Sequence, residues 1–167
     1  MEGTKAVIGL VLSIAIPFIM NSKLTDVSNT LIKGKLTELK ALTYFLELGY
    51  IVSIPEVPCQ YDFLLDVKGI ILKIQVKTCR KCIDNEGAIE FNTSSMTHNN
   101  KGYTRREYTA DMVDYFCTYY ENQCYLVPLN ECGNRCKRLR IAPTKNGQTK
   151  NICFAKNYIA KDVLERL

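Results

Sequence analysis

The stretch YDFLLDVKGIILKIQVKT, residues 61–78, determines the fold that we predict for this chain. Apolar and β-branched residues dominate it, and the Lys-Gly pair at 68–69 favours a tight turn, so a β-hairpin is predicted. A two-residue turn sets Asp62 opposite Gln75 across the two strands. Because side chains alternate between the faces of a strand, Gln75 and Lys77 then point the same way, and Asp62 lies within reach of both.

The polar side chains of this hairpin have two interpretations. The other face suits a buried core, through Phe63, Leu65, Val67, Leu72, Ile74 and Val76. One interpretation is half of a phosphodiesterase site, because a carboxylate such as Asp62 can bind a divalent metal and a lysine can orient water and stabilise charge on phosphorus. The other is a solvated surface on which Asp62 and Lys77 form an ordinary pair. The hairpin alone does not decide between them.

Length, charge and cysteine content limit the class of protein. A chain of 167 residues is expected to form one domain with a sizeable core. The net charge of +5 favours an anionic partner but is too small to establish nucleic-acid binding alone. The eight cysteines lie within apolar, strand-like segments of a chain long enough to fold without disulfides. We therefore expect reduced thiols in an intracellular protein, cytoplasmic or organellar, rather than a secreted disulfide framework.

Residues 1–20 are interpreted as a hydrophobic N-terminal extension. The apolar run at 6–20 is short for a transmembrane helix, which needs about 20 apolar residues. It resembles the core of a signal peptide, but Glu2 weakens the basic start and no small-residue cleavage site follows. We favour a third interpretation, in which Met20 is the working start and residues 21–167 form the functional domain. A membrane anchor at residues 6–20 is the alternative.

Residues 33–48 are predicted to form a helix that Gly49 ends. Leucines recur at helical spacing and are expected to form its buried stripe, namely Leu36, Leu39, Leu42 and Leu46. Glu38 lies early in the helix and away from the centre of that stripe. It is either a solvated carboxylate favoured by the helix dipole or a second carboxylate that reaches a metal site from the helix.

The remaining elements are predicted mainly as strands. We expect strands at 50–54, 86–91, 111–120, 123–129 and 135–140, and a closing helix at 155–167. The four residues of interest, Glu38, Asp62, Gln75 and Lys77, therefore fall at successive points along one helix and the strands that follow it.

This order of elements and residues resembles the PD-(D/E)XK nuclease superfamily. The pattern Asp62…Gln75-Val76-Lys77 is similar to its metal-binding aspartate and (D/E)-x-K signature, and helix glutamates at the position of Glu38 are common there. The resemblance implies an α/β fold with a restriction-endonuclease-like core, a mixed β-sheet flanked by helices. Gln75 departs from the pattern, because most members have an acid there, and such a change is compatible with a nuclease that has lost its activity.

The Gln-x-Lys variant resembles one branch of this superfamily, the homing endonucleases encoded by group I introns. Segments 108–116, 125–128 and 138–148 are similar to that branch as well. The resemblance implies site-specific cleavage of double-stranded DNA with Mg²⁺. It also implies a homodimer or homotetramer, because a chain with one site must break two strands. The interface candidates are Tyr119, Tyr120 and Tyr125, although core packing explains these tyrosines at least as well.

The resemblance further implies roles for the site residues. Asp62 and the backbone carbonyl of Val76 would bind magnesium, and Glu38 would bind it directly or through water. Lys77 would position the attacking water and stabilise the pentavalent phosphorus. Gln75 would orient water or bind the metal through its carbonyl. Two other functions stay open: a Holliday-junction resolvase or a repair or restriction nuclease of the same superfamily, and a non-catalytic DNA-binding protein.

Basic residues in several segments are candidate DNA contacts, because cations neutralise phosphates and the interleaved tyrosines Tyr103 and Tyr108 can pack against sugar or base. They are Arg80, Lys81, Lys101, Arg105, Arg106, Arg138, Arg140 and Lys145, together with the amide of Gln148. For residues 94–106 the alternative is an exposed loop. For residues 135–140 it is a solvated edge strand whose charges prevent aggregation.

The cysteines allow one further hypothesis. Cys79 and Cys82 form a C-x-x-C pair, and Cys132 and Cys136 form a second pair with slightly longer spacing. Together they could supply four thiolates to a structural zinc ion. Such a zinc site would suit the non-catalytic DNA-binding alternative.

Overall fold

The structure is a computed structural model that describes residues 30–99, 102–144 and 147–167. The chain divides into two units, residues 1–33 and 34–167, and only residues 30–33 are described in the first. The predicted extension at 1–20, with its signal-peptide, anchor and alternative-start interpretations, lies outside the described residues. Among the residues that the structure describes, no helix is long and apolar enough to cross a membrane.

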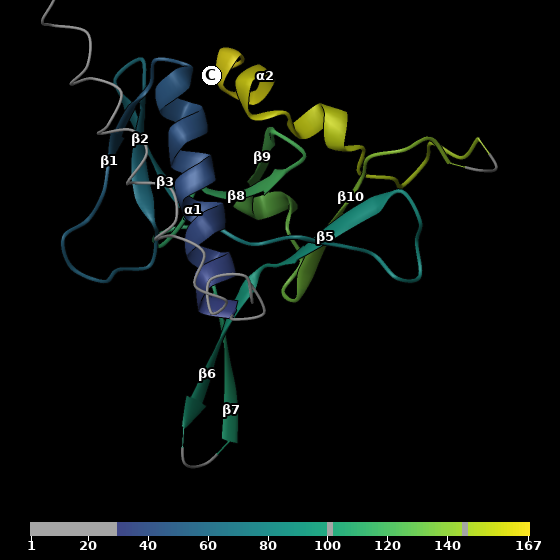
Figure 1. Ribbon diagram of the computed structural model, residues 1–167, viewed down its shortest axis with the longest axis horizontal. Helices are drawn as coiled ribbons and strands as arrows, with labels where there is room; N and C mark the ends of the chain where they lie inside the picture. Colours follow the sequence, from purple (N-terminus) through teal and green to yellow (C-terminus); the bar gives the residue numbers. More distant parts are fainter. Residues whose placement is uncertain (1–29, 100–101, 145–146) are drawn as a thin grey trace, which may run out of the picture. The chain divides into compact units, whose positions relative to one another are not determined.

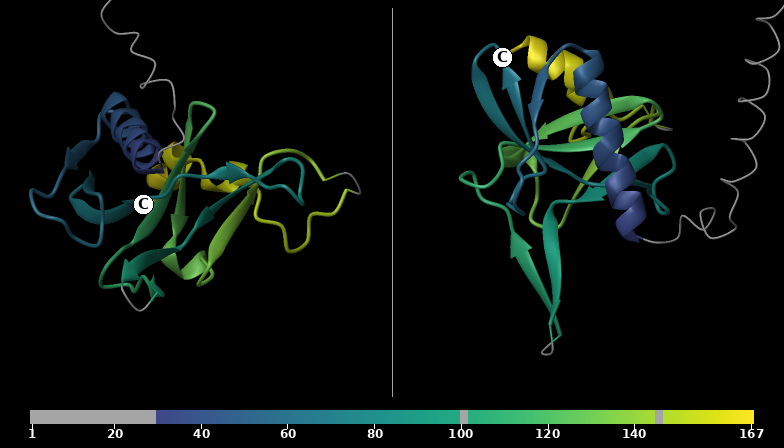
Figure 2. Two further views of the ribbon diagram at one scale, coloured as in Figure 1. Left: turned by 60° about the horizontal axis from the view of Figure 1, so that its bottom comes forward. Right: turned by 60° about the vertical axis from the view of Figure 1, so that its left-hand side comes forward.

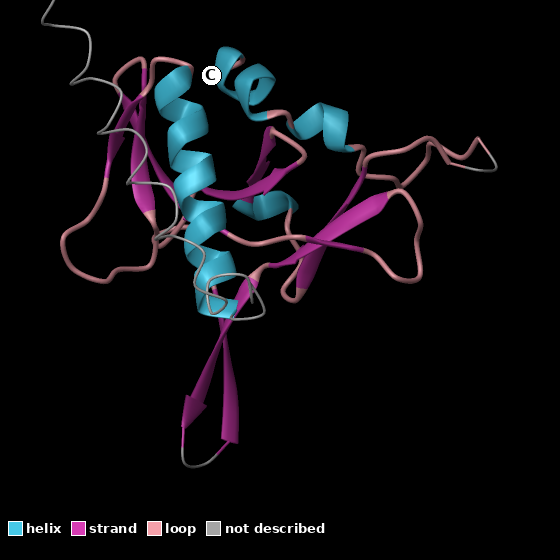
Figure 3. Ribbon diagram, in the orientation of Figure 1, coloured by secondary structure: helices cyan, strands magenta, loops and turns pink. Residues whose placement is uncertain are grey.

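A five-stranded mixed sheet forms the centre of the second unit, in the order β1-β2-β3-β8-β9 (Figure 1, Figure 3). Its strands are β1 (Ile51–Ser53), β2 (Phe63–Val67), β3 (Ile70–Val76), β8 (Tyr115–Tyr120) and β9 (Gln123–Pro128). Strands β3 and β8 run parallel, and the other neighbouring pairs are antiparallel. Helices flank this sheet, so the predicted fold class is confirmed.

The hairpin β2–β3 has the predicted register. Lys68 and Gly69 form its turn with φ angles of 53° and 87°, as expected of a two-residue turn that matches the twist of the strands. Leu65 pairs with Leu72, which fixes the predicted alignment of the two strands. All six apolar side chains that the sequence assigns to the core are buried.

The helix α1 (Thr30–Glu47) ends before Gly49, whose φ of 84° supplies the left-handed conformation that commonly follows a helix. The predicted leucine stripe is wrong. Leu36, Leu39 and Leu46 are 43%, 48% and 50% exposed, whereas Leu42 is half-buried. The residues of α1 that are buried are Thr37, Ala41 and Phe45.

The reason for this difference lies in the sheet beneath the helix. The ring of Phe45 packs edge-on against that of Phe63 in β2, with 5.8 Å between the ring centroids. Ala41 and Thr37, one and two turns earlier, are small enough to let the helix approach the sheet closely. Periodicity alone favoured the larger leucines, but the fit to the sheet selects the face with the small residues.

Two short helices close the chain where one was predicted at 155–167. A 3₁₀ helix, η3 (Ala155–Tyr158), is followed by α2 (Ala160–Glu165). Between them Ile159 has φ −54° and ψ 124°, which is not helical, and it forms a β-bridge with Tyr125 of β9. This pairing with the sheet interrupts the helix. Buried residues of α1, β2, β3 and α2 then share one hydrophobic cluster.

A second, three-stranded sheet is ordered β10-β5-β4. It consists of β10 (Cys136–Arg140), β5 (Ala88–Asn92) and β4 (Arg80–Lys81), and a 3₁₀ turn, η2 (Leu129–Glu131), leads from β9 toward it. Ile89, Phe91 and Leu139 from this sheet share a second hydrophobic cluster with Phe116 and Val127 of the central sheet. The basic strand at 136–140 is therefore an edge strand, exposed on one face and packed on the other.

The polar segment at 94–106 is a hairpin rather than a loop. Within the part of the chain that the structure describes, strands β6 (Ser94–Asn99) and β7 (Gly102–Glu107) pair only with each other, and they extend away from the rest of this unit (Figure 2). Met96 and Tyr103 are exposed, at 53% and 76%. The sequence of residues 94–107 is mostly polar and lacks the alternation of apolar and polar residues that marks a half-buried strand, so its pattern does not indicate strands.

Candidate active site

The residues predicted to form a site gather at one end of the β2–β3 hairpin, away from its turn. Asp62 directly precedes β2 and Lys77 directly follows β3, and because these strands are antiparallel, the two positions lie at the same end. The backbone N–H of Asp62 donates to the carbonyl of Ile74 at 2.8 Å. The pairing thus continues past β2 and brings Asp62 beside Gln75, as predicted.

The carboxylate of Asp62 is held by two donors from β3. Its Oδ2 accepts hydrogen bonds from the backbone N–H of Val76 at 2.6 Å and from Gln75 Nε2 at 2.5 Å. The same Nε2 also donates to the backbone carbonyl of Val76 at 3.3 Å. Gln75 is 9% exposed, so its amide contacts are made out of bulk water. Three of the predicted site residues therefore converge on one point.

The ionisation of Asp62 reflects this environment. Burial raises the pKa of its carboxyl group, the hydrogen bond from the Val76 N–H lowers it, and the negative charge of Glu38 raises it again. The resulting pKa is about 6, against an ordinary value of 3.8. The raised pKa means that the ionised form of Asp62 is disfavoured in this site. A divalent cation beside it would favour the ionised form.

Glu38 reaches this end of the sheet from α1. It lies seven residues before Phe45, about two helical turns, and so on nearly the same side of the helix as that buried ring. Its side chain is 25% exposed and pairs with Lys35 at 2.8 Å. Its influence on the pKa of Asp62 places the two carboxylates in one electrostatic environment. Glu38 is therefore partly buried, and its role at a metal site stays a prediction.

Backbone and side-chain contacts hold Lys77 at the junction of β3 and β8. Its N–H donates to the carbonyl of Cys117 at 2.8 Å, and its own carbonyl accepts a hydrogen bond from Thr118 Oγ1 at 2.7 Å. Its Nζ donates to the hydroxyl of Tyr108 at 2.8 Å and lies 4.7 Å from the centroid of that ring. The ammonium of Lys77 is thus fixed by one tyrosine.

Sequence reasoning considered Tyr108 only as a residue that could pack on DNA. The structure instead places it against Lys77, 31 residues earlier in the chain, with its ring edge-on to Phe116 at 5.3 Å. The local sequence around Tyr108 carries no signal for this contact, because it depends on the parallel pairing of β3 with β8.

The chemistry of the site residues fits a hard divalent cation. Asp62 and Glu38 supply carboxylates, and the Val76 carbonyl supplies a neutral oxygen near Asp62, while Gln75 faces both oxygens with its Nε2. Among the described residues, no three His, Cys, Asp or Glu side chains gather as a metal-binding group. Two carboxylates and a nearby carbonyl oxygen form a ligand set of the kind that hard divalent cations take.

Two of the predicted DNA contacts belong to one charged cluster on the second sheet. Arg80 and Arg138 flank Glu90, with Arg80 NH2 2.7 Å from Glu90 Oε1 and Arg138 Nε 2.8 Å from Glu90 Oε2. The two arginine side chains are 62% and 53% exposed. Hydrogen bonding from Arg138 lowers the pKa of Glu90, which keeps it ionised. The arginines can still reach an external phosphate, but Glu90 offsets part of their charge.

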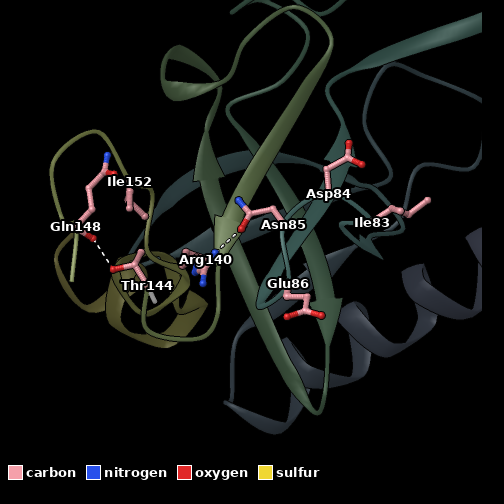
Figure 4. A pocket seen from close by; sticks show the side chains of 8 residues that line it. All are labelled: Ile83, Asp84, Asn85, Glu86, Arg140, Thr144, Gln148 and Ile152. Carbon is pink, nitrogen blue, oxygen red and sulfur yellow. Dashed lines mark hydrogen bonds between the residues drawn. The ribbon is translucent and has the colours of Figure 1, made fainter. Parts of the chain in front are cut away.

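Arg140 is occupied within the chain. It donates from Nε to the carbonyl of Ala142 at 2.8 Å, from NH2 to the carbonyl of Pro143 at 2.9 Å, and from NH1 to Asn85. It lines an open pocket of about 780 Å³ together with Asn85, Thr144 and Gln148 (Figure 4). None of the residues proposed for catalysis lines this pocket. A DNA contact by Arg140 or Gln148 stays a prediction.

Arg105 and Arg106 lie on β7 and are exposed. As neighbours along a strand they point to opposite faces of the hairpin. Lys81, on β4, is exposed as well. Lys101 and Lys145 lie outside the described residues. The hairpin β6–β7 therefore presents one arginine on each of its faces.

The structure does not bring the four cysteines of the zinc hypothesis together. All eight cysteines of the chain are free thiols in the structure. Cys79 donates to the carbonyl of Tyr119 at 3.5 Å, and Cys132 packs in the second hydrophobic cluster. Burial raises the pKa of Cys132 to about 12, which opposes formation of a thiolate. The described residues thus hold no tetrathiolate site.

Comparisons with known proteins agree with this geometry. A family model described as PD-(D/E)XK endonuclease matches residues 28–161. Among solved structures, that of a bacterial homing endonuclease, I-Ssp6803I, has a similar fold, with a TM-score of 0.67 and 23% sequence identity. The similarity covers 83% of this chain and 95% of that one. No protein of curated function matches the chain significantly.

Proposed function

The chain belongs to the PD-(D/E)XK endonuclease family, and on that premise we propose that it is a site-specific, magnesium-dependent endonuclease that cleaves double-stranded DNA. The observation that carries this proposal is the convergence of Asp62, Gln75 and Val76 on one point at the end of β3. Lys77 follows directly in the chain and presents an ammonium held by Tyr108. These are the groups that phosphodiester hydrolysis with a bound metal needs.

In this proposal Asp62, the Val76 carbonyl and Glu38 hold the magnesium ion, with Glu38 acting directly or through water. The ion supplies Lewis acidity toward a phosphoryl oxygen and lowers the pKa of a bound water. Lys77 orients the attacking water and stabilises the negative charge that develops on the phosphoryl group. Its ammonium is positively charged and offers three hydrogen-bond donors. Burial of the site strengthens each of these electrostatic interactions.

Gln75 has a separate part in this proposal. Its Nε2 now contacts both Asp62 Oδ2 and the Val76 carbonyl, the two oxygens that would bind the ion. An amide nitrogen does not coordinate magnesium, so Gln75 would contact the ion or orient a water through its side-chain oxygen, with the amide turned from its present contacts. A neutral amide here lowers the negative charge of the site relative to an acid.

The hairpin β6–β7 is the best-supported DNA contact of the chain. It projects from the unit, and its width as a two-stranded ribbon suits the major groove (Figure 2). Arg105 and Arg106 on opposite faces could contact the phosphates of the two groove walls. The exposed Arg80 and Arg138, near the end of the central sheet, are secondary candidates.

We further propose that the enzyme is of the intron-homing type. The Gln-x-Lys pattern of residues 75–77 and the similar fold of a bacterial homing endonuclease support this substrate class. A junction resolvase or a repair or restriction nuclease of the same family is the alternative. The genetic context decides: an open reading frame within a group I intron supports homing, and a freestanding gene beside a methyltransferase or repair gene contradicts it.

We also propose a homo-oligomer, because two symmetric sites break two strands more directly than one site that cuts twice. The exposed leucines of α1 offer an apolar surface for it, because Leu36 and Leu39 line an open groove of about 410 Å³ with Tyr119. All three candidate tyrosines pack partly against the core, Tyr119 against the first hydrophobic cluster and Tyr120 and Tyr125 against the second, but of the three Tyr119 alone lines this groove. We therefore propose that α1 and Tyr119, rather than Tyr120 and Tyr125, form the contact between copies.

Cleavage of a randomised duplex library with and without Mg²⁺ tests the proposed function. Sequencing of the products is expected to show one extended target sequence, cut only when Mg²⁺ is present. Binding of the library without cleavage under any divalent ion would favour the non-catalytic DNA-binding alternative. Cleavage of branched junctions in preference to linear duplexes would favour the resolvase alternative.

A further inference from the structure

Tyr108 connects the projecting hairpin to the site. It is the first residue after β7 (Gly102–Glu107), and its half-buried ring packs edge-on against Phe116 at 5.3 Å. Phe116 in turn pairs with Gln75 in the parallel register of β3 and β8. The ring is therefore fixed by an aromatic contact to β8, the strand that pairs with β3 at Gln75, while its hydroxyl is directed at Lys77.

A lysine needs such a contact more than other site residues do. Its long side chain has many rotamers, so an ammonium without partners samples many positions. Within the described residues, the hydroxyl of Tyr108 is the one acceptor to which Lys77 Nζ donates. The nearby ring adds an attraction at 4.7 Å, but a ring face does not define a direction as a hydroxyl does.

We propose that Tyr108 is a positioning residue for the reaction, whose hydroxyl sets the location of the Lys77 ammonium. An ammonium has no lone pair, so Lys77 donates and the Tyr108 oxygen accepts. Two further hydrogens of the ammonium remain for the attacking water and for a phosphoryl oxygen. Tyr108 therefore orients the reactive group without taking its capacity to donate.

This inference rests on the proposed function only for its catalytic consequence. The contact itself is a property of the free protein and can be measured without DNA or metal. Tyr108→Phe removes the hydroxyl and keeps the ring, and hence its packing on Phe116 and its attraction for the ammonium. Tyr44→Phe is the matched control, because it removes a hydroxyl that accepts a hydrogen bond from Gln123 Nε2 at 2.6 Å outside the site.

The first measurement is nuclear magnetic resonance of the lysine ammonium groups in the free protein. Lys77→Arg identifies the Lys77 signal by its loss. We expect a high order parameter for Lys77 Nζ in the wild type. In Tyr108→Phe it should fall to the values of exposed lysines. In Tyr44→Phe it should not change. An unchanged order parameter in Tyr108→Phe would overturn the inference, whether or not the protein proves to be a nuclease.

The second measurement is single-turnover cleavage of a duplex recovered from the randomised library, with Mg²⁺ and protein in excess. Tyr108→Phe is expected to lower the rate constant about 10- to 100-fold, the usual cost of losing a partner that orients a site residue. Its affinity for the duplex should match that of the wild type, and its melting temperature should match that of Tyr44→Phe, which also lacks one tyrosine hydroxyl. A wild-type rate in Tyr108→Phe would overturn the proposed role.

A third result would also contradict it. If Tyr108→Phe weakens DNA binding by the same factor as it lowers cleavage, then Tyr108 contacts DNA as part of the basic segment and does not act through Lys77. Failure of the wild type to cleave any duplex would refute the proposed function, and the magnetic resonance measurement would still decide whether Tyr108 positions Lys77.

Discussion

The side-chain amide of Gln75 donates a hydrogen bond of 2.5 Å to Asp62 Oδ2. The same nitrogen also donates to the carbonyl of Val76, so it lies between the two oxygens that we propose as metal ligands. Without metal, the Gln75 amide and the Val76 N–H together supply hydrogen bonds to the partly buried carboxylate of Asp62, which feels the negative charge of Glu38. A neutral amide therefore allows the site to exist before the ion arrives, which two adjacent acids would do less well.

The first prediction follows from this contact. Gln75→Glu replaces the donor by a second carboxylate beside Asp62, and the metal-free protein should lose about 1–3 kcal/mol of unfolding free energy at pH 7. Magnesium should restore most of that stability, and some cleavage should be retained. Thermal unfolding with and without Mg²⁺ measures the effect.

Gln123→Glu is the control for this prediction. It changes another partly buried glutamine, which donates to Tyr44, at a position without a neighbouring site carboxylate. Its stability should not respond to magnesium. Equal responses of the two variants to the ion would show that position 75 lies outside the metal site.

The second prediction concerns pH. The pKa of Asp62 in the folded protein is about 6, above its ordinary value of 3.8. The folded state therefore binds the proton of this carboxyl group more tightly than the unfolded state does, and the protonated form stabilises the fold. Its contribution is fully present below about pH 4 and is lost as the pH rises through 6. Asp62→Asn, which cannot ionise, should therefore become more stable than the metal-free wild type by about 2 kcal/mol at pH 7.

Urea unfolding of both proteins between pH 4 and pH 8, with a chelator present, measures this difference. Addition of Mg²⁺ should remove it by stabilising the wild type alone. A difference that does not grow between pH 4 and pH 7 would contradict the raised pKa of Asp62 in the folded protein.

The sequence predicts one part of the molecule well and another poorly, for a physical reason. The hairpin β2–β3 is local: its turn, its alternation and the pairing that brings Asp62 to Gln75 are all encoded within 18 residues, 61–78. The buried face of α1 is not local, because apolar residues lie on more than one side of that helix. Packing against Phe63 selects Ala41 and Phe45, and the leucines stay exposed.

The same distinction explains the site. Asp62, Gln75 and Lys77 could be placed together from strand geometry, whereas Tyr108 and Lys77 meet only through the parallel pairing of β3 with β8. The internal role of Arg140 likewise depends on a loop that folds back onto β10. Contacts between segments far apart in the chain require a register that composition and periodicity do not supply.

The third prediction concerns DNA binding. Alanine at both Arg105 and Arg106 should weaken binding of a duplex and reduce the slope of log affinity against log salt by about 2, because each lost phosphate contact removes about one released counterion. Titrations at several salt concentrations measure this slope. Alanine at both Lys156 and Lys161 is the charge-matched control, since these exposed lysines lie on η3 and α2, and it should leave the slope unchanged. Equal slopes in all three proteins would mean that the hairpin does not contact DNA.

The fourth prediction concerns assembly. Glutamine at both Leu39 and Leu46 should lower the mass of the protein measured by light scattering, because it removes apolar area from the exposed face of α1. These side chains are already about half exposed, so the fold of one copy should be preserved. Ile83→Gln, at a side chain that is 95% exposed, should leave the mass unchanged. A wild-type mass in the double variant would place the contact between copies elsewhere.

The central claim is that Asp62 binds the metal ion that drives cleavage, and single-turnover cleavage by Asp62→Ala tests it most directly. The substrate is a duplex recovered from the randomised library, and DNA affinity is measured in parallel to show that the variant still binds. We expect cleavage in Mg²⁺ to be abolished while the affinity for the duplex stays close to that of the wild type. Cleavage by Asp62→Ala at the wild-type rate would contradict the assignment of this site.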